Sequence, residues 1–102
     1  MNTALLIIDL QNDFIEGLME VKGIRKQIPK LKKFIDQCRK KGILIIYTRH
    51  LFSFKENPIE GKLFPQYRNG GLRKGTPGAD IYKEIEPTKE DLVIDKHRYD
   101  AF

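Results

Sequence analysis

Ala-Leu-Leu-Ile-Ile-Asp-Leu-Gln-Asn-Asp-Phe, residues Ala4–Phe14, is the stretch of sequence on which the prediction of the fold depends. Its first five residues are apolar without alternation, which predicts a short strand buried on both faces, as inside a parallel sheet. Asp9 follows directly, so we expect it at the carboxyl edge of the sheet, where open α/β folds bind their ligands. An aspartate that caps or anchors a loop fits the same position, and the stretch alone leaves both interpretations open.

A helix and two more strands are predicted downstream. Ile43–Tyr47 and Leu92–Ile94 are further continuous apolar runs of strand length. Before the second strand, apolar residues recur at spacings of three and four and predict one amphipathic helix: Ile28, Leu31, Phe34, Ile35 and Cys38. Pro29 suits the first turn of this helix, and Gly42 suits the position just past its end. The order strand–helix–strand predicts a βαβ unit with parallel strands and a right-handed crossover.

The segment between the second and third predicted strands is less regular. Leu51–Lys74 is rich in aromatic residues and glycine and has no sustained period, which predicts a long loop with a functional role or a bound partner. After it, residues 75–78 indicate a turn into a short helix, with Thr76 as its cap and Pro77 in its first turn. Pro87 ends that helix.

The composition describes one small globular domain over residues 1–102. Of these residues, 40% are hydrophobic and 32% charged, which excludes a disordered chain. No apolar run approaches the about 20 residues that span a bilayer, so we expect no membrane association. Cys38 is the single cysteine, which excludes an internal disulfide and predicts a cytoplasmic protein. Its place on the apolar stripe predicts a small buried side chain rather than a nucleophile.

The net charge of +5, from 19 basic and 14 acidic residues, raises the question of nucleic-acid binding. The basic residues concentrate in residues 25–41 and 68–74, without the interleaved aromatic residues on which bases stack. Lysines on the solvated side of an amphipathic helix give the same total. We therefore expect no nucleic-acid partner.

Polar residues follow each of the three predicted strands: Asp9, the run 48–50 (Thr-Arg-His), and Lys96. At one edge of a parallel sheet, Asp9 and Lys96 would face each other, and each charge would favour the ionised form of the other. Such a pair can move a proton and convert a nearby thiol into a thiolate nucleophile. A structural ion pair at the edge of the sheet is the alternative.

Three blocks of the sequence carry a resemblance to a known family: Ala4–Phe14, Ile43–His50 (ILIIYTRH) and Gly75–Phe102 (GTPGADIYKEIEPTKEDLVIDKHRYDAF). In this order and spacing the chain resembles the first half of an isochorismatase-like hydrolase, a superfamily that includes nicotinamidases and N-carbamoyl amide hydrolases. The resemblance implies a partial Rossmann-like, three-layer α/β fold with a parallel sheet. It also implies that residues 1–102 form a single, truncated domain.

The resemblance assigns roles to individual residues. Asp9 falls on the family's catalytic aspartate, a general base for thiol and water, and Lys96 on its catalytic lysine, which stabilises the charged form. Thiol-using members add a cysteine from a later segment and cleave an amide; in the branch that cleaves the vinyl ether of isochorismate, the aspartate protonates the substrate. Residues expected to contact a small-molecule substrate are Gln11, Phe14, His50, Tyr99 and Phe102. For His50 a hydrogen-bonding role at the rim of the cleft is the main prediction, and a substrate contact is the alternative.

The chain departs from the family pattern in two ways. Nicotinamidase-like members bind a metal through an Asp-x-His motif after the second strand, whereas here His50 stands alone until His97. One histidine does not make a metal site, so we predict no metal and no cofactor. The sequence also ends at Phe102, before the segment that would carry the nucleophilic cysteine, so we expect no thiol-dependent turnover from this chain alone.

Two hypotheses about function follow. The first is a hydrolase half that acts on an amide or an isochorismate-type vinyl ether once the missing segment is supplied. The second is a non-catalytic interaction module, or pseudoenzyme, of the same fold. Half a sheet leaves apolar strands uncovered, so in either case we expect a homo-oligomer.

Overall fold

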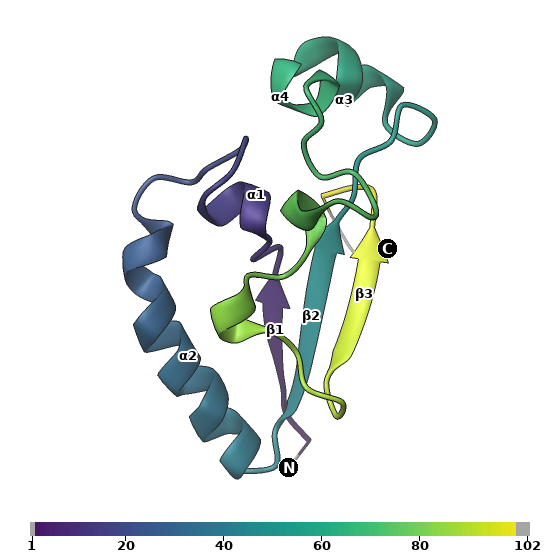
Figure 1. Cartoon of the computed structure of the whole chain (residues 1–102). Coiled ribbons are helices and arrows are strands. Elements are labelled where there is room, and N and C mark those ends of the chain that lie inside the picture. The colour runs from purple at the N-terminus through teal and green to yellow at the C-terminus, as the bar shows by residue number, and fades with distance from the viewer. Residues whose placement is uncertain (1, 100–102) are drawn as a thin grey trace.

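The computed structural model describes residues 2–99 of the chain. Its centre is one parallel sheet of three strands in the order β1 (Ala4–Ile8), β2 (Leu44–His50) and β3 (Leu92–Lys96). Helix α2 (Ile24–Lys40) connects β1 to β2 and runs alongside the sheet (Figure 1). The predicted α/β class and the parallel βαβ unit are therefore confirmed.

Helix α2 begins one turn earlier than the sequence predicted. The prediction placed Pro29 in the first turn, but the helix starts at Ile24 and contains Pro29 in its interior. Ile24 packs against the apolar core, and this burial stabilises a turn that the proline rule alone does not anticipate. Gly42 lies just past the end of the helix with φ of +74°, the left-handed conformation that glycine adopts without strain.

The segment predicted as a long loop contains two short helices, so that prediction is wrong for part of its length. Helix α3 (Pro58–Leu63) and helix α4 (Pro65–Arg68) each begin with a proline, whose fixed φ suits a first turn. They project beyond the carboxyl end of the sheet (Figure 1). Another short helix, α1 (Asn12–Ile15), follows β1.

The short helix predicted after residue 76 is instead a pair of single 3₁₀ turns, η1 (Pro77–Ala79) and η2 (Lys83–Ile85). Ile81 lies between them and forms an isolated antiparallel bridge with Gln11. Because the bridge requires extended backbone at Ile81, a continuous helix cannot run from η1 into η2. The predicted side-chain cap is also wrong, because the Thr76 hydroxyl donates to the Arg73 carbonyl oxygen at 2.6 Å instead.

The main core lies between the sheet and α2. It is formed by alternate residues of β1 and β2, by the apolar stripe of α2 and by the segment from Ile81 to Ile85, and it includes Ile7, Ile28, Ile35, Ile45, Tyr47, Ile81 and Ile85. Cys38 is 6% exposed within this core, so the prediction that it is a small buried side chain is confirmed.

The opposite side of the sheet carries no covering layer among residues 2–99. We call it the uncovered face; Thr48 lies on it between Ile8 and Ile94, and its apolar residues are Ala4, Leu6, Ile8, Leu44, Ile46, Leu92 and Ile94. Leu6 and Ile8 are 56% and 58% exposed, so the prediction that the first strand is buried on both faces is wrong for this chain. The described residues thus form two of the three expected layers.

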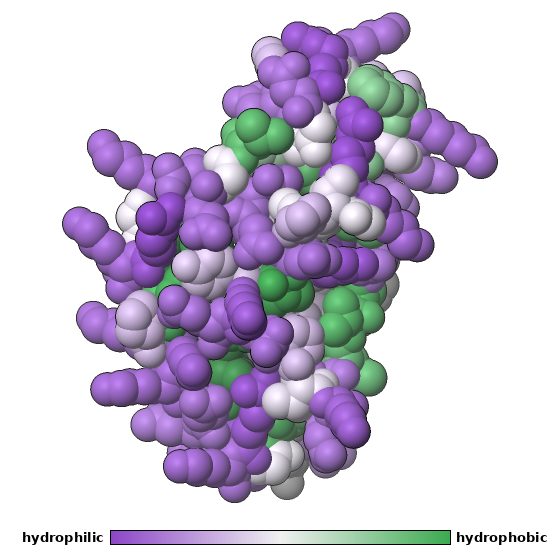
Figure 2. Space-filling model, in the orientation of Figure 1, coloured by the Kyte–Doolittle hydropathy of each residue, from purple (hydrophilic) through white to green (hydrophobic). Residues whose placement is uncertain are grey.

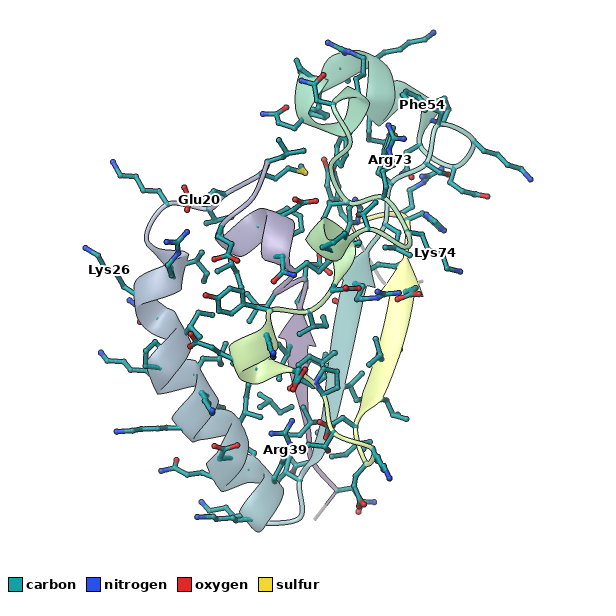
Figure 3. All side chains as sticks on the ribbon, viewed as in Figure 1. Glu20, Lys26, Arg39, Phe54, Arg73 and Lys74 are labelled. Carbon is teal, nitrogen blue, oxygen red and sulfur yellow. The ribbon has the colours of Figure 1, made fainter. Side chains whose placement is uncertain are left out.

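The outer side of α2 is basic and solvated. Lys26 is exposed and extends away from the sheet (Figure 3). Much of the net positive charge of the chain therefore comes from the solvated side of this amphipathic helix. Within residues 2–99, every helix is too short or too polar to cross a bilayer.

Candidate active site

Asp9 stands directly after β1 in an unusual backbone conformation. Its φ is +58°, in the left-handed region that residues with a Cβ seldom adopt. Thr48, near the carboxyl end of β2, holds Asp9 in this conformation. The Asp9 N–H donates to the Thr48 carbonyl oxygen at 3.2 Å, and the Thr48 hydroxyl donates to Asp9 Oδ1 at 2.7 Å. Strained backbone that is fixed by its neighbours is typical of functional sites.

Lys96, the last residue of β3, completes an ion pair with Asp9. Its Nζ lies 3.0 Å from Asp9 Oδ2 and also donates to the carbonyl oxygen of Arg98 at 2.9 Å. The lysine side chain is 5% exposed and that of Asp9 is 23% exposed. The structure therefore brings the two predicted catalytic residues together, with the lysine buried and the carboxylate still reachable from solvent.

His50 lies between Lys96 and an aromatic cluster, which consists of Phe52, Phe54 and Tyr67. Its Nδ1 is 3.4 Å from Lys96 Nζ, and its Nε2 is 3.4 Å from the hydroxyl oxygen of Tyr67. Burial and the positive charge of Lys96 hold the pKa of His50 below its ordinary value of 6.5, so the ring is neutral at pH 7. Because an ammonium group only donates, Nδ1 accepts and the ring proton resides on Nε2, directed toward Tyr67.

Tyr67 is a site residue that the sequence did not identify. It lies in α4, is 4% exposed, and stacks on Phe52 with ring centroids 4.7 Å apart. Burial raises the pKa of its phenol above the ordinary value, so it stays protonated. The only signal was the aromatic content of Leu51–Lys74, and without a period that content selects no single residue.

These groups border a pocket of about 270 Å³. Its polar lining residues are Asp9, His50, Gln66 and Tyr67, and its apolar lining residues are Phe14, Met19, Phe64 and Tyr99. Three predicted substrate contacts, Phe14, His50 and Tyr99, are thus brought to one pocket. The ring of Tyr99, which is 82% exposed, lies nearly parallel to that of His50 with centroids 6.2 Å apart.

Gln11 does not line this pocket, which corrects its predicted role as a substrate contact. Its side chain is fully buried. Its Nε2 donates to the carbonyl oxygens of His50 and Ala79, both at 2.9 Å, and its Oε1 accepts from the His50 N–H at 2.7 Å. Gln11 therefore ties the end of β2 to η1 and positions His50. Phe102 lies outside the described residues.

Two further polar residues fix the loop that carries Tyr67. Asp13 Oδ2 accepts from the backbone N–H of Leu72 at 2.7 Å, at a residue whose φ is +56°. Asn57 is fully buried and donates to the carbonyl oxygen of His97 at 2.5 Å. The first contact ties the loop to α1, and the second ties it to the chain that follows β3.

Arg73 packs its guanidinium group against the rings of the aromatic cluster. Its guanidinium lies 5.1 Å from the ring centroid of Phe52 and 4.9 Å from that of Phe54, within the range of cation–π attraction. Figure 3 shows Arg73 and Phe54 side by side at this end of the molecule. Arg73 also donates to the Tyr67 carbonyl oxygen at 3.0 Å, so it helps to fix the backbone of α4.

The residues present do not fit a metal ion. Within the described part of the chain, no three His, Cys, Asp or Glu side chains gather as ligands. Both ring nitrogens of His50 face groups that carry protons, the Lys96 ammonium and the Tyr67 hydroxyl. Cys38 is buried in the core on the α2 side of the sheet and is no part of the pocket lining.

The arrangement is suited to proton transfer. Asp9 presents a carboxylate whose two oxygens are held by a hydroxyl and by an ammonium group, at the border of a largely apolar pocket. A carboxylate fixed in this way accepts a proton from a bound group and returns it without reorganising.

Comparisons with known proteins agree on one family. The isochorismatase domain model matches residues 3–102. A probable inactive nicotinamidase of Arabidopsis thaliana is 34% identical over 99% of this chain and 55% of its own length. An isochorismatase of Bacillus subtilis is 36% identical over 97% of this chain and 31% of its own length.

A solved structure supports the same fold. The crystal structure of a cysteine hydrolase from Pseudomonas syringae pv. phaseolicola matches with a TM-score of 0.88 at 24% identity, over 99% of this chain and 49% of that one. The chain spans about half the length of most curated relatives that it matches. Since the domain model covers nearly every residue, the chain belongs to the isochorismatase family.

Proposed function

We propose that this chain carries the proton-transfer part of a hydrolase active site, with Asp9 as general acid and base and Lys96 as its charge partner. The observation that supports this most directly is the exposure of the Asp9 carboxylate at the pocket while Lys96 and Thr48 hold its oxygens. A carboxylate with only a structural role would not need an opening onto a pocket. His50 and Tyr67 line the same pocket as neutral, hydrogen-bonding groups.

In the proposed reaction Asp9 takes the proton from a thiol, and the thiolate attacks the carbonyl carbon of a bound amide. The C–N bond breaks, and the departing amine receives the proton from Asp9. Water then gives a proton to Asp9 and attacks the acyl-enzyme, which releases the acid and restores the thiol. The thiol belongs to the part of the family fold that this chain does not match, because Cys38 is buried elsewhere.

The pocket favours an uncharged amide over an anionic substrate. Of the described lining residues, Asp9 is the only charged one, and Lys96 Nζ, 3.0 Å from its carboxylate, balances that charge, so the described lining offers an anion no unpaired positive charge. His50 is neutral at pH 7 and so adds no positive charge. Amide hydrolysis is therefore favoured over cleavage of an isochorismate-type dianion, the two reactions that the sequence left open.

Nicotinamide and nicotinate form a matched pair of probes, because they share a ring and differ in charge. We expect nicotinamide to shift the NMR signals of His50 and Tyr99 saturably at pH 7, and nicotinate to bind at least tenfold more weakly. Asp9→Asn should remove the preference, and Cys38→Ala should leave it intact. Equal affinities, or no saturable binding of either compound, would contradict the proposal.

A second candidate function is a non-catalytic module that associates with itself. Two observations favour it: the matched Arabidopsis protein is described as probably inactive, and the uncovered face exposes apolar side chains. Sedimentation equilibrium of the whole chain distinguishes this candidate. A stable dimer at micromolar concentration whose formation leaves the pocket without ligand preference would favour it over the hydrolase.

A further inference from the structure

The hydroxyl of Tyr67 and the ring of His50 share one hydrogen bond, and its direction is set from the other side of the ring. Lys96 Nζ, 3.4 Å from His50 Nδ1, has protons to donate and no lone pair to accept with, so Nδ1 is the acceptor. The single proton of the neutral ring is therefore on Nε2, which donates to the Tyr67 hydroxyl oxygen at 3.4 Å. Tyr67 accepts in this bond, and its own proton is not used in it.

The proton of the Tyr67 hydroxyl has no acceptor among residues 2–99. Within that part of the chain, the contact with His50 is the only hydrogen bond of this hydroxyl. The phenol stays protonated because burial raises its pKa, and the residue is only 4% exposed. Buried tyrosine hydroxyls usually have a hydrogen-bond partner, and a buried donor without one is costly. Tyr67 therefore offers a free donor at the pocket that it lines.

Packing fixes the position of this donor. The Tyr67 ring stacks on Phe52 with centroids 4.7 Å apart and meets the Phe64 ring edge-on at 6.0 Å. The Tyr67 carbonyl oxygen accepts from the Arg73 guanidinium at 3.0 Å and from the Gly70 N–H at 3.2 Å. Because ring and backbone are both held before any ligand binds, a hydrogen bond from this hydroxyl costs little conformational entropy.

The Tyr67 donor and the Asp9 carboxylate lie on different sides of His50. Asp9 contacts Lys96, which faces Nδ1 of the ring, whereas Tyr67 faces Nε2. The two nitrogens of an imidazole point away from each other, so a molecule in the pocket meets the carboxylate and the hydroxyl at two separate points. Since Asp9 serves the reacting amide group in the proposed function, the Tyr67 proton is left for an acceptor elsewhere on the same molecule.

The remaining lining of the pocket suits a flat ring. Phe14, Phe64 and Tyr99 are aromatic, and aromatic side chains stack on planar groups. The volume of about 270 Å³ lies below the about 300–1,000 Å³ of sites for drug-sized ligands, which favours a single ring with a short substituent. Phe64 lies between α3 and α4 and is 40% exposed, and Figure 2 shows hydrophobic surface where these helices project in Figure 1.

We propose that Tyr67 determines the specificity of this pocket by donating a hydrogen bond to an acceptor on the ring of an aromatic amide, away from the amide group. The inference rests on the proposed function, in which Asp9 acts at the amide. It adds a substrate class: aromatic amides whose ring carries an acceptor such as a pyridine nitrogen, in preference to amides of a hydrocarbon ring. His50 acts as a positioning residue, because its Nε2–H directs the Tyr67 proton away from the imidazole.

Four ligands of nearly equal size test this proposal: benzamide and the three pyridine carboxamides, with the ring nitrogen ortho, meta or para to the amide. Each is titrated into the whole chain at pH 7, and the NMR signals of Phe14 and Tyr99 are followed. We expect at least one pyridine isomer to bind about three- to tenfold more tightly than benzamide, the effect of one neutral hydrogen bond. In Tyr67→Phe this advantage should disappear, while the affinity for benzamide stays the same.

Tyr82→Phe is the matched control. Tyr82 packs against the core and is no part of the pocket lining, so loss of its hydroxyl should leave the advantage of the pyridine isomer intact. Circular dichroism should show both variants folded at the temperature of the titration. The nitrogen NMR shifts of His50, measured without ligand, report the position of its ring proton independently. We expect that proton on Nε2 in the native chain and in Tyr67→Phe.

Three results would overturn the proposal: no isomer binds more tightly than benzamide, the advantage survives in Tyr67→Phe, or His50 carries its proton on Nδ1. In the last case Tyr67 would have to donate to Nε2, and its proton would not be free. The four ligands are all uncharged amides, so they test Tyr67, whereas nicotinamide against nicotinate tests Asp9. A preference for the amide without a preference for the ring nitrogen would refute only this inference. A ring preference that depends on Tyr67, without a preference for the amide, would refute only the proposed function.

Discussion

Replacing Lys96 with methionine tests whether the Asp9 carboxylate depends on this buried cation. The two charges are 3.0 Å apart, which at an effective dielectric constant of about 20 corresponds to about 5 kcal/mol of gross attraction. Part of this is offset because methionine, unlike an ammonium group, has no cost of burial. Removing one partner of a buried pair costs about 3–5 kcal/mol in measured cases. Asp9 is 23% exposed, so water stabilises the remaining carboxylate and we expect the lower end, about 3 kcal/mol.

Urea unfolding followed by circular dichroism measures this loss. The midpoint should fall while the dependence on urea concentration stays the same, because the surface exposed on unfolding is unchanged. Lys26→Met is the matched control: Lys26 is exposed on α2, and its loss should change stability by less than about 0.5 kcal/mol. In a double-mutant cycle with Asp9→Asn, the second change should cost little once the first is made. Strictly additive effects, or a loss below about 1 kcal/mol, would refute the ion pair as described.

Further predictions concern pH and buried hydrogen bonds. Lys96→Met should raise the pKa of His50 toward its ordinary value, because a nearby positive charge is removed while burial remains; histidine proton shifts followed against pH measure this. Since the folded state holds this pKa below 6.5, stability should also fall in the native chain as pH drops below 6.5. The Arg49 hydrogen bonds lower the pKa of Asp95, so Arg49→Met should flatten the loss of stability seen as pH falls below about 4. Gln11→Leu should cost about 2–4 kcal/mol in urea unfolding, because it leaves main-chain groups of β2 and η1 without partners.

The sequence predicted those features that depend on local pattern. Continuous apolar runs located all three strands, and a period of three to four located α2. The rule that parallel strands end at one edge was enough to bring Asp9 and Lys96 together. Each of these predictions follows from spacing along the chain, and spacing is what a sequence displays directly.

The features that the sequence missed depend on contacts between distant segments. Tyr67 reaches the site because α4 folds back over the end of β2, and a helix of four residues is too short to produce a period. Gln11 follows Asp9 closely, yet its side chain turns inward to bind main-chain groups of His50 and Ala79. Burial on both faces of β1 was predicted from an apolar pattern, and that burial requires residues beyond those described here.

The contacts that position Asp9 all come from within this half of the fold. Thr48 on β2 fixes the left-handed backbone and one carboxylate oxygen, and Lys96 on β3 fixes the other oxygen. At the same edge of the sheet, Gln11 accepts a hydrogen bond from the His50 N–H, and His50 Nδ1 lies 3.4 Å from Lys96 Nζ. The Asp9 carboxylate is therefore held in place by contacts within the described residues, as the proposed proton transfer requires. It follows that Thr48→Val should disturb the Asp9–Lys96 pair, because the hydroxyl that donates to Asp9 Oδ1 is lost; a shift of the NMR signals of the Lys96 side chain would measure this, and unchanged signals would contradict it.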